Sequence, residues 1–124
     1  MQFFYVAVGG AFGASLRFAS HQIITYLLNT KFIIATIIIN CIGAFLIGFL
    51  IYLFEVFTID IKWKLFFITG FLGGYTTFST YSLETIQYFL DGNIKHALIN
   101  IFLSNILCLV FVLAGMQISK AALD

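Results

Sequence analysis

Four long apolar runs, separated by short segments that hold most of the charged residues, constrain the fold of this chain more than any other feature. The runs cover residues 3–28, 32–54, 65–90 and 97–119. The second is uncharged and can cross a hydrocarbon layer of about 30 Å at about 1.5 Å per residue. Only 9% of the residues are charged and 62% are hydrophobic, unlike a soluble domain. We therefore expect an all-α integral membrane protein with four transmembrane helices in one domain, residues 1–124.

The third run contains a segment, Gly70-Phe-Leu-Gly-Gly-Tyr-Thr-Thr-Phe-Ser-Thr-Tyr-Ser82, that is rich in glycines and hydroxyl groups. An interrupted backbone at membrane depth must find partners in protein, water or a bound ion. The chain has no proline, so we expect Gly73 and Gly74 to break the helix, with Thr76 and Thr77 available as caps. Such a break frees carbonyls for a cation and N–H groups for an anion. The alternative is an unbroken helix packed through its glycines.

Polar side chains also lie deep in the second and fourth runs. A buried amide such as that of Asn40 costs several kcal/mol unless it is hydrogen-bonded, so it faces another helix or a polar path. Asn100, Ser104 and Cys108 recur every four residues, which places them on one face of a helix. Amide and hydroxyl donors along one face are typical of a track for an anion. The alternative for each is a hydrogen bond that holds helices together.

Phe78 and Tyr81 lie three residues apart and therefore share a face of the restarted helix. The edges of aromatic rings carry partial positive charge, so these rings can contact an anion without a full charge that would trap it. Packing is the alternative role for the pair.

The few basic residues show no bias between the two sides of the membrane that four crossings define. One side holds Lys62, Lys64 and Lys120; the other holds Lys31, Lys95 and, if it lies near the interface, Arg17. Because an excess of Lys and Arg orients a membrane protein, a balanced chain can insert either way up and pair as an antiparallel dimer. Chance balance among so few charges is the alternative.

Three pairs of small residues spaced four apart are candidates for close helix packing. They are Gly9 with Gly13, Gly70 with Gly74, and Ala44 with Gly48.

The segment from Gly70 to Ser82 closely resembles the signature of the Fluc/CrcB fluoride channels. Gly9-Gly-Ala-Phe-Gly-Ala-Ser-Leu-Arg17-Phe18 is similar to the first-helix pattern of that family, and Thr36-Ile-Ile-Ile-Asn40-Cys-Ile-Gly43 to its second-helix pattern. Together the three ordered motifs span most of the four-run chain.

The resemblance implies a passive, fluoride-selective channel that lets fluoride leave the cytoplasm. It also implies an antiparallel, dual-topology homodimer with two pores, in a bacterial inner membrane or the plasma membrane of a single-membrane microbe. A structural sodium ion at the dimer centre would be held by the backbone carbonyls of Gly73 and Thr76. The implied fluoride-pore residues are Asn40, Phe78, Tyr81, Thr80, Asn100, Ser104 and Cys108.

Two departures from the family pattern stand out. Tyr81 takes the place of the usual second phenylalanine, and its hydroxyl either bonds within the pore or points out of it. On the fourth helix, Asn100 and Cys108 replace the aromatic and hydroxyl residues expected there. Arg17 matches in place, and either attracts anions at a vestibule or anchors the end of its helix.

Two other functions remain as alternatives. A small dual-topology multidrug or cation exporter needs a membrane-buried carboxylate in its first helix, yet no acidic residue precedes Glu55. A non-transporting assembly subunit would use the same polar residues as contacts between helices. We expect neither enzymatic activity nor a nucleic-acid partner; the expected partners are a second copy of the chain, fluoride and membrane lipid.

Overall fold

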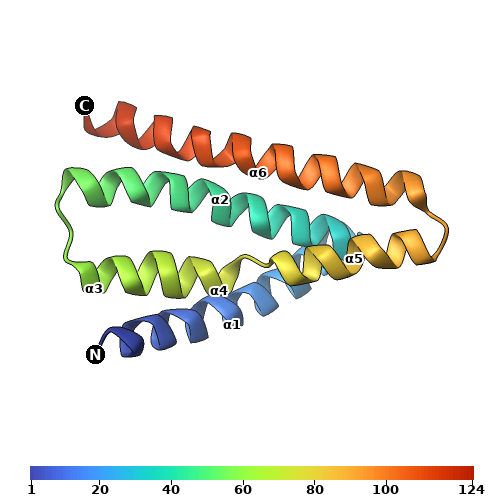
Figure 1. Cartoon of the computed structure of the whole chain (residues 1–124), viewed down its shortest axis with the longest axis horizontal. Coiled ribbons are helices and arrows are strands. Elements are labelled where there is room, and N and C mark those ends of the chain that lie inside the picture. Colours follow the sequence, from blue (N-terminus) through green and yellow to red (C-terminus); the bar gives the residue numbers. More distant parts are fainter.

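The computed structural model describes residues 1–31 and 33–124, and these form helices that run lengthwise along the molecule (Figure 1). In chain order the elements are α1 (Gln2–Leu28), α2 (Phe32–Val56), α3 (Ile61–Lys64), the π-helix η1 (Leu65–Leu72), α4 (Gly73–Tyr75), α5 (Phe78–Leu90) and α6 (Ile94–Leu123). No strand occurs within the described residues. The expected all-α class is confirmed.

Three of the helices, α1, α2 and α6, are each long and apolar enough to cross a membrane. The elements α3, η1, α4 and α5 together form a fourth passage along the molecule, interrupted midway (Figure 1). Both chain termini lie at the end of the molecule where α2 connects to α3, and the α5–α6 turn lies at the other end. Large apolar side chains such as Phe3, Phe102 and Leu113 are exposed on the outside, as lipid contact requires. The chain is a multi-pass membrane protein.

The helices extend beyond the predicted runs at several ends. The Asp60 side chain accepts a hydrogen bond from the backbone N–H of Lys62 at 3.0 Å, so the third passage begins at Ile61 rather than at 65. At the turns, Asn29 adopts a left-handed conformation with φ 46° after α1, and Gly92 has φ 78° between α5 and α6.

Glycines bring α1 into backbone contact with the first half of the third passage. A Cβ at Gly9 or Gly13 would overlap the carbonyl oxygen of Phe66 or Phe71, respectively. From the other side, a Cβ at Gly74 would lie 2.7 Å from the carbonyl oxygen of Gly10. The predicted packing role of these glycines is confirmed, because only a residue without a side chain fits there.

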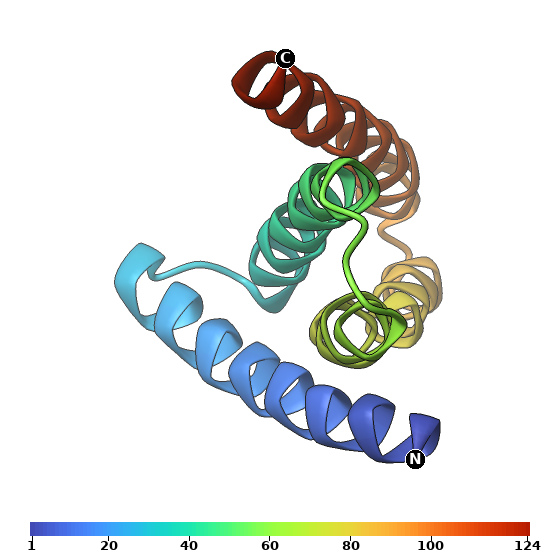
Figure 2. The same cartoon turned by 90° about the vertical axis from the view of Figure 1, so that its left-hand side faces the viewer.

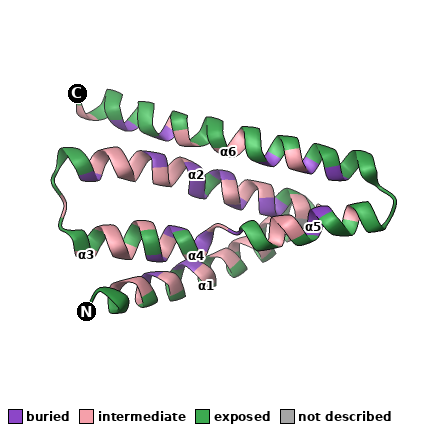
Figure 3. Ribbon diagram, in the orientation of Figure 1, coloured by how far each residue is buried: buried purple, intermediate pink, exposed green. Residues whose placement is uncertain are grey.

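A second glycine contact joins α2 and α6, which run in the same direction side by side (Figures 1 and 2). A Cβ at Gly48 would overlap the backbone of Val112, and one at Gly115 would overlap the carbonyl oxygen of Phe45. Ile39 on α2 is only 1% exposed, and buried residues occur along both α2 and α6 (Figure 3). The α2–α6 contact therefore forms the other half of the core.

The third passage is broken as predicted, but the glycines do not break it. Gly73 is helical with φ −62° and ψ −34°, and Gly74 lies within α4. The backbone leaves the helix at Thr76, with ψ 157°, and at Thr77, with φ −147° and ψ 114°. The expectation that glycine makes the break is wrong, because β-branched threonines favour the extended conformation while Gly74 is needed against α1.

Gly13→Ala should destabilise the protein by about 1–3 kcal/mol, because the added methyl group would overlap the backbone of η1. Gly10→Ala is the matched control, since its Cβ would lie 3.8 Å from the Gly70 carbonyl oxygen, an ordinary contact. Thermal unfolding in detergent, followed by circular dichroism, measures both. Equal stability of the two variants would contradict the contact.

Candidate functional site

Asn40 of α2 holds the break in the third passage through two hydrogen bonds to one residue. Its Nδ2 donates to the carbonyl oxygen of Thr77 at 3.1 Å, and the Thr77 N–H donates to its Oδ1 at 2.8 Å. In a continuous helix, the Thr77 N–H would donate to the Gly73 carbonyl instead. The Asn40 Oδ1 thus takes the place of the Gly73 carbonyl as acceptor and leaves that carbonyl without its helical donor.

Thr77 also caps the helix that restarts after the break. Its Oγ1 accepts from the Thr80 N–H at 3.2 Å and donates to the Thr80 Oγ1 at 3.0 Å. These bonds satisfy one of the free N–H groups at the start of α5. The structure therefore gives Thr80, a predicted pore residue, a place in the helix cap.

Arg17 of α1 reaches the same break. Its Nη1 donates to the carbonyl oxygen of Thr76 at 3.2 Å, which places the guanidinium midway along the molecule rather than at an interface. This contact ties α1 to the broken passage, so the structure gives Arg17 an anchoring contact.

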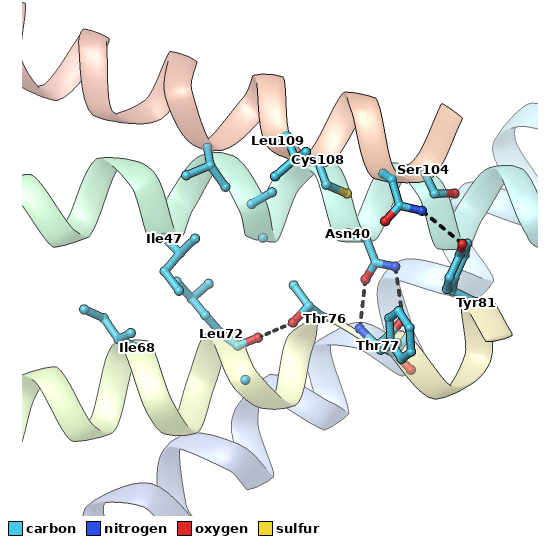
Figure 4. A pocket seen from close by; sticks show the side chains of 16 residues that line it. Asn40, Ile47, Ile68, Leu72, Thr76, Thr77, Tyr81, Ser104, Cys108 and Leu109 are labelled. Atoms are coloured by element: carbon cyan, nitrogen blue, oxygen red, sulfur yellow. Dashed lines mark hydrogen bonds between the residues drawn. The ribbon is translucent and has the colours of Figure 1, made fainter. Parts of the chain in front are cut away.

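A cavity of about 430 Å³ lies beside the break, between α2, the two halves of the third passage, and α6 (Figure 4). Its polar lining consists of Asn40, Thr76, Thr77, Tyr81, Ser104, Asn105 and Cys108, and its apolar lining includes Ile47, Ile68, Leu72, Phe78 and Leu109. Every lining residue in the described part of the chain is uncharged. A neutral, mostly apolar wall that carries a few polar groups can contact an anion without holding it through a full opposite charge.

The structure brings five of the seven predicted pore residues to this cavity. These are Asn40, Phe78, Tyr81, Ser104 and Cys108, and the two predicted sodium ligands, Gly73 and Thr76, line it as well. Thr80 and Asn100 are absent from the lining.

Asn100 instead continues a polar chain away from the cavity. Ser104 donates to the Oδ1 of Asn100 at 3.0 Å, and the Asn100 Nδ2 donates to Thr85 Oγ1 at 2.9 Å. All three residues are buried. The contact between Ser104 and Asn100 confirms that the four-residue spacing places them on one helix face.

The two aromatic rings of the pair stand next to each other at the cavity. The centroids of Phe78 and Tyr81 are 5.3 Å apart with the rings tilted by 47°. The Tyr81 hydroxyl accepts a hydrogen bond from Asn105 Nδ2 at 3.0 Å. The hydroxyl therefore bonds to another residue of the cavity wall.

A buried carboxyl group was missed as a site residue by the sequence analysis. Glu84 of α5 is 8% exposed, and its Oε1 accepts a hydrogen bond from Thr36 Oγ1 at 2.8 Å. Its second oxygen, Oε2, is buried without a partner within the described part of the chain. A carboxyl group inside an apolar run was the signal that could have found it, since such groups are costly and commonly functional.

The sequence profile of the CrcB-like protein, Camphor Resistance (CrcB), family matches residues 4–116, which include the whole site. The chain belongs to the CrcB-like family. The resemblance seen in its motifs is thus confirmed.

Curated relatives cover nearly the full length of the chain. A protein from Campylobacter fetus is 42% identical over 118 residues, covering 94% of this chain and 92% of the relative. One from Ruminiclostridium cellulolyticum is 43% identical, covering 93% and 89%. One from Shewanella amazonensis is 40% identical, covering 92% of each. All three are named fluoride-specific ion channel FluC, which describes a channel rather than an enzyme.

Asn40→Ala should lower the free energy of unfolding by about 1–3 kcal/mol for each backbone group of Thr77 that it leaves unpaired. Asn105→Ala is the control, because that amide is exposed and bonds no part of the break. Hydrogen exchange of the Thr77 amide, measured by NMR in detergent, should rise strongly in the first variant and change little in the second. Unchanged hydrogen exchange in Asn40→Ala would contradict the two hydrogen bonds between Asn40 and Thr77.

Proposed function

We propose that this protein is a fluoride-specific ion channel that passively releases fluoride from the cytoplasm and so relieves its toxicity. The observation that carries the proposal is the uncharged cavity at the broken passage, in a chain about 40% identical to proteins named as such channels. A passive path suits this wall, because nothing in it needs to change protonation for an anion to pass.

Asn40 and Tyr81 each have a hydrogen-bond donor for an ion in the cavity. One N–H of the Asn40 side chain is used by Thr77, and the other remains for a ligand. The Tyr81 oxygen accepts from Asn105, which leaves the O–H proton of Tyr81 to donate. With the positive edge of the Phe78 ring, these groups offer fluoride replacements for its water shell.

Beyond the cavity, the buried chain of Ser104, Asn100 and Thr85 gives the ion a polar route along α5 and α6. In this proposal Asn100 is part of the polar route and does not line the cavity. Cys108 lines the cavity and contributes a weak hydrogen-bond donor there. Thr36 and Glu84 lie where α2 meets α5, and we include them in the region that controls passage.

The alternatives fit less well. An exporter of cations would bind its substrate at a carboxylate, but the cavity wall is uncharged and Glu84 is bonded to Thr36 outside that wall. An assembly subunit would leave the open cavity without a purpose.

Purified protein in liposomes loaded with potassium fluoride should release fluoride once valinomycin lets potassium leave. A fluoride electrode follows the release. Release no faster than from protein-free vesicles would overturn the channel function and leave the assembly alternative.

In the same assay, Phe78→Ile should slow release at least about tenfold, which corresponds to about 1.4 kcal/mol, because an alkyl group has no positive edge. Phe102→Ile, on the exposed face of α6, is the matched control and should retain release. Equal rates in Phe78→Ile and Phe102→Ile would remove the ring from the mechanism.

The working unit in this proposal is an antiparallel, dual-topology homodimer with two pores, one beside each broken passage, in the cell (inner) membrane. Lys62, Lys64 and Lys120 lie on elements at the end with both termini, and Lys31 and Lys95 at the other end. Since Arg17 lies midway, it favours neither side. The near balance supports insertion in both orientations.

C-terminal fusions to a periplasmic and a cytoplasmic reporter, alkaline phosphatase and green fluorescent protein, should both be active in Escherichia coli. Adding three lysines after Asp124 should bias the chain towards one orientation, because basic residues are retained in the cytoplasm. Activity of only one reporter in the unmodified protein would refute dual topology.

We also propose a structural sodium ion at the dimer centre, held by the carbonyl oxygens of Gly73 and Thr76. Backbone oxygens are hard ligands that suit a hard cation. The Gly73 carbonyl fits, because its helical donor has gone to Asn40. The Thr76 carbonyl also accepts from Arg17, which occupies one of its two lone pairs.

Purification in sodium-free N-methylglucamine buffer should lower the thermal stability of the dimer, and added sodium should restore it. Restoration by N-methylglucamine chloride at equal ionic strength would show a salt effect and contradict a sodium site.

A further inference from the structure

The two cysteines of the chain come together between α2 and α6. Cys41 is buried at 6% exposure on α2, and Cys108 is half-buried on α6 and lines the cavity. Figure 4 shows the Cys108 side chain directed from α6 towards α2.

The packing of the two helices fixes this pairing independently. Glycine contacts hold Gly48 against Val112 and Gly115 against Phe45, with α2 and α6 running in the same direction. Cys41 lies one turn before Phe45, and Cys108 lies one turn before Val112. Because the glycines allow no sliding of one backbone against the other, Cys41 and Cys108 are held at the same level of the two helices.

The surroundings limit what the pair can bind. Within the described residues, no group of three or more His, Cys, Asp or Glu side chains could hold a metal ion. Zinc in a structural site takes four such ligands, so a two-sulfur site does not suit it. Soft ions that accept two ligands in a line, such as Hg²⁺ and Ag⁺, suit two sulfurs alone.

We propose that Cys41 and Cys108 form a bidentate site for a soft, two-coordinate metal ion, entered from the cavity through Cys108. Binding of Hg²⁺ replaces both S–H bonds with Hg–S bonds and releases two protons. The product, two thiolates with one divalent ion, has no net charge. A neutral product suits a buried site, where an uncompensated charge is costly.

The site has a consequence that rests on the proposed function. Cys108 lies on the same helix face as Ser104 and lines the same cavity. A metal ion on Cys108 would place a bulky group in the fluoride path. The protein should therefore be a fluoride channel that thiophilic metals close.

Titration of the purified protein in detergent with HgCl₂ tests the site without measuring transport. These are the only two cysteines in the chain, so one Hg²⁺ per chain should consume both thiols and release two protons, and intact mass should rise by one mercury less two hydrogens. In Cys41→Ser and Cys108→Ser, each Hg²⁺ should release one proton. A competing monothiol should remove mercury from these variants at a roughly 100-fold lower concentration than from the unmodified protein. In the unmodified protein the second cysteine holds the ion through a high effective concentration.

Uptake of two Hg²⁺ per chain, each on one thiol, would overturn the proposal. So would equal retention of mercury by the unmodified protein and the single variants. Circular dichroism of the variants checks that they remain folded. In liposomes, one equivalent of Hg²⁺ should slow fluoride release at least tenfold in the unmodified protein and leave Cys108→Ser unaffected. If Hg²⁺ binds to both cysteines but fluoride release is not slowed, the metal site is upheld and Cys108 lies outside the fluoride path. Failure of the metal site and failure of the proposed channel function are therefore distinguishable.

Discussion

The reciprocal pair of hydrogen bonds between Asn40 and the backbone of Thr77 is the interaction on which the rest of the structure depends. A helix cannot open at membrane depth unless another group satisfies the N–H and C=O that it releases. Here the Asn40 Oδ1 accepts from the released Thr77 N–H, while its Nδ2 donates to the Thr77 carbonyl and the Gly73 carbonyl is left without its helical donor. The main features of the site follow from this change of hydrogen-bond partner. They are the cap on α5, the freed Gly73 carbonyl and the position of the aromatic pair.

Packing around the break depends on two sets of glycines, each of which joins a different pair of helices. On α1 and the first half of the third passage, Gly9, Gly13 and Gly74 allow backbones to touch. On α2 and α6, Gly48 and Gly115 do the same. Lipid offers no hydrophobic drive for helices to associate, so close contact and hydrogen bonds must supply the stability. The break can exist because rigid helix pairs on both sides hold its ends in place.

The electrostatics of the cavity fit the passage of a small anion. Its wall is uncharged. Arg17 and Glu84 are not part of that wall: Arg17 donates to the Thr76 carbonyl, and Glu84 accepts from Thr36. A full charge in the wall would either trap an anion or repel it. Neutral donors bind it weakly enough for release, which is the condition for conduction.

The sequence by itself determined the membrane class, the four passages, the presence of a break and the family, because these depend on hydrophobic length and on local motifs. It placed the break at the wrong residues: glycine was the local breaker available, yet Gly73 and Gly74 are both helical, and Gly74 packs against α1. The tertiary structure alone decided that Thr76 and Thr77 open, that Tyr81 bonds to Asn105, that Arg17 reaches the break and that Glu84 meets Thr36. Each of these depends on contacts between residues far apart in the chain, and hydrophobic periodicity says nothing about which helix faces meet.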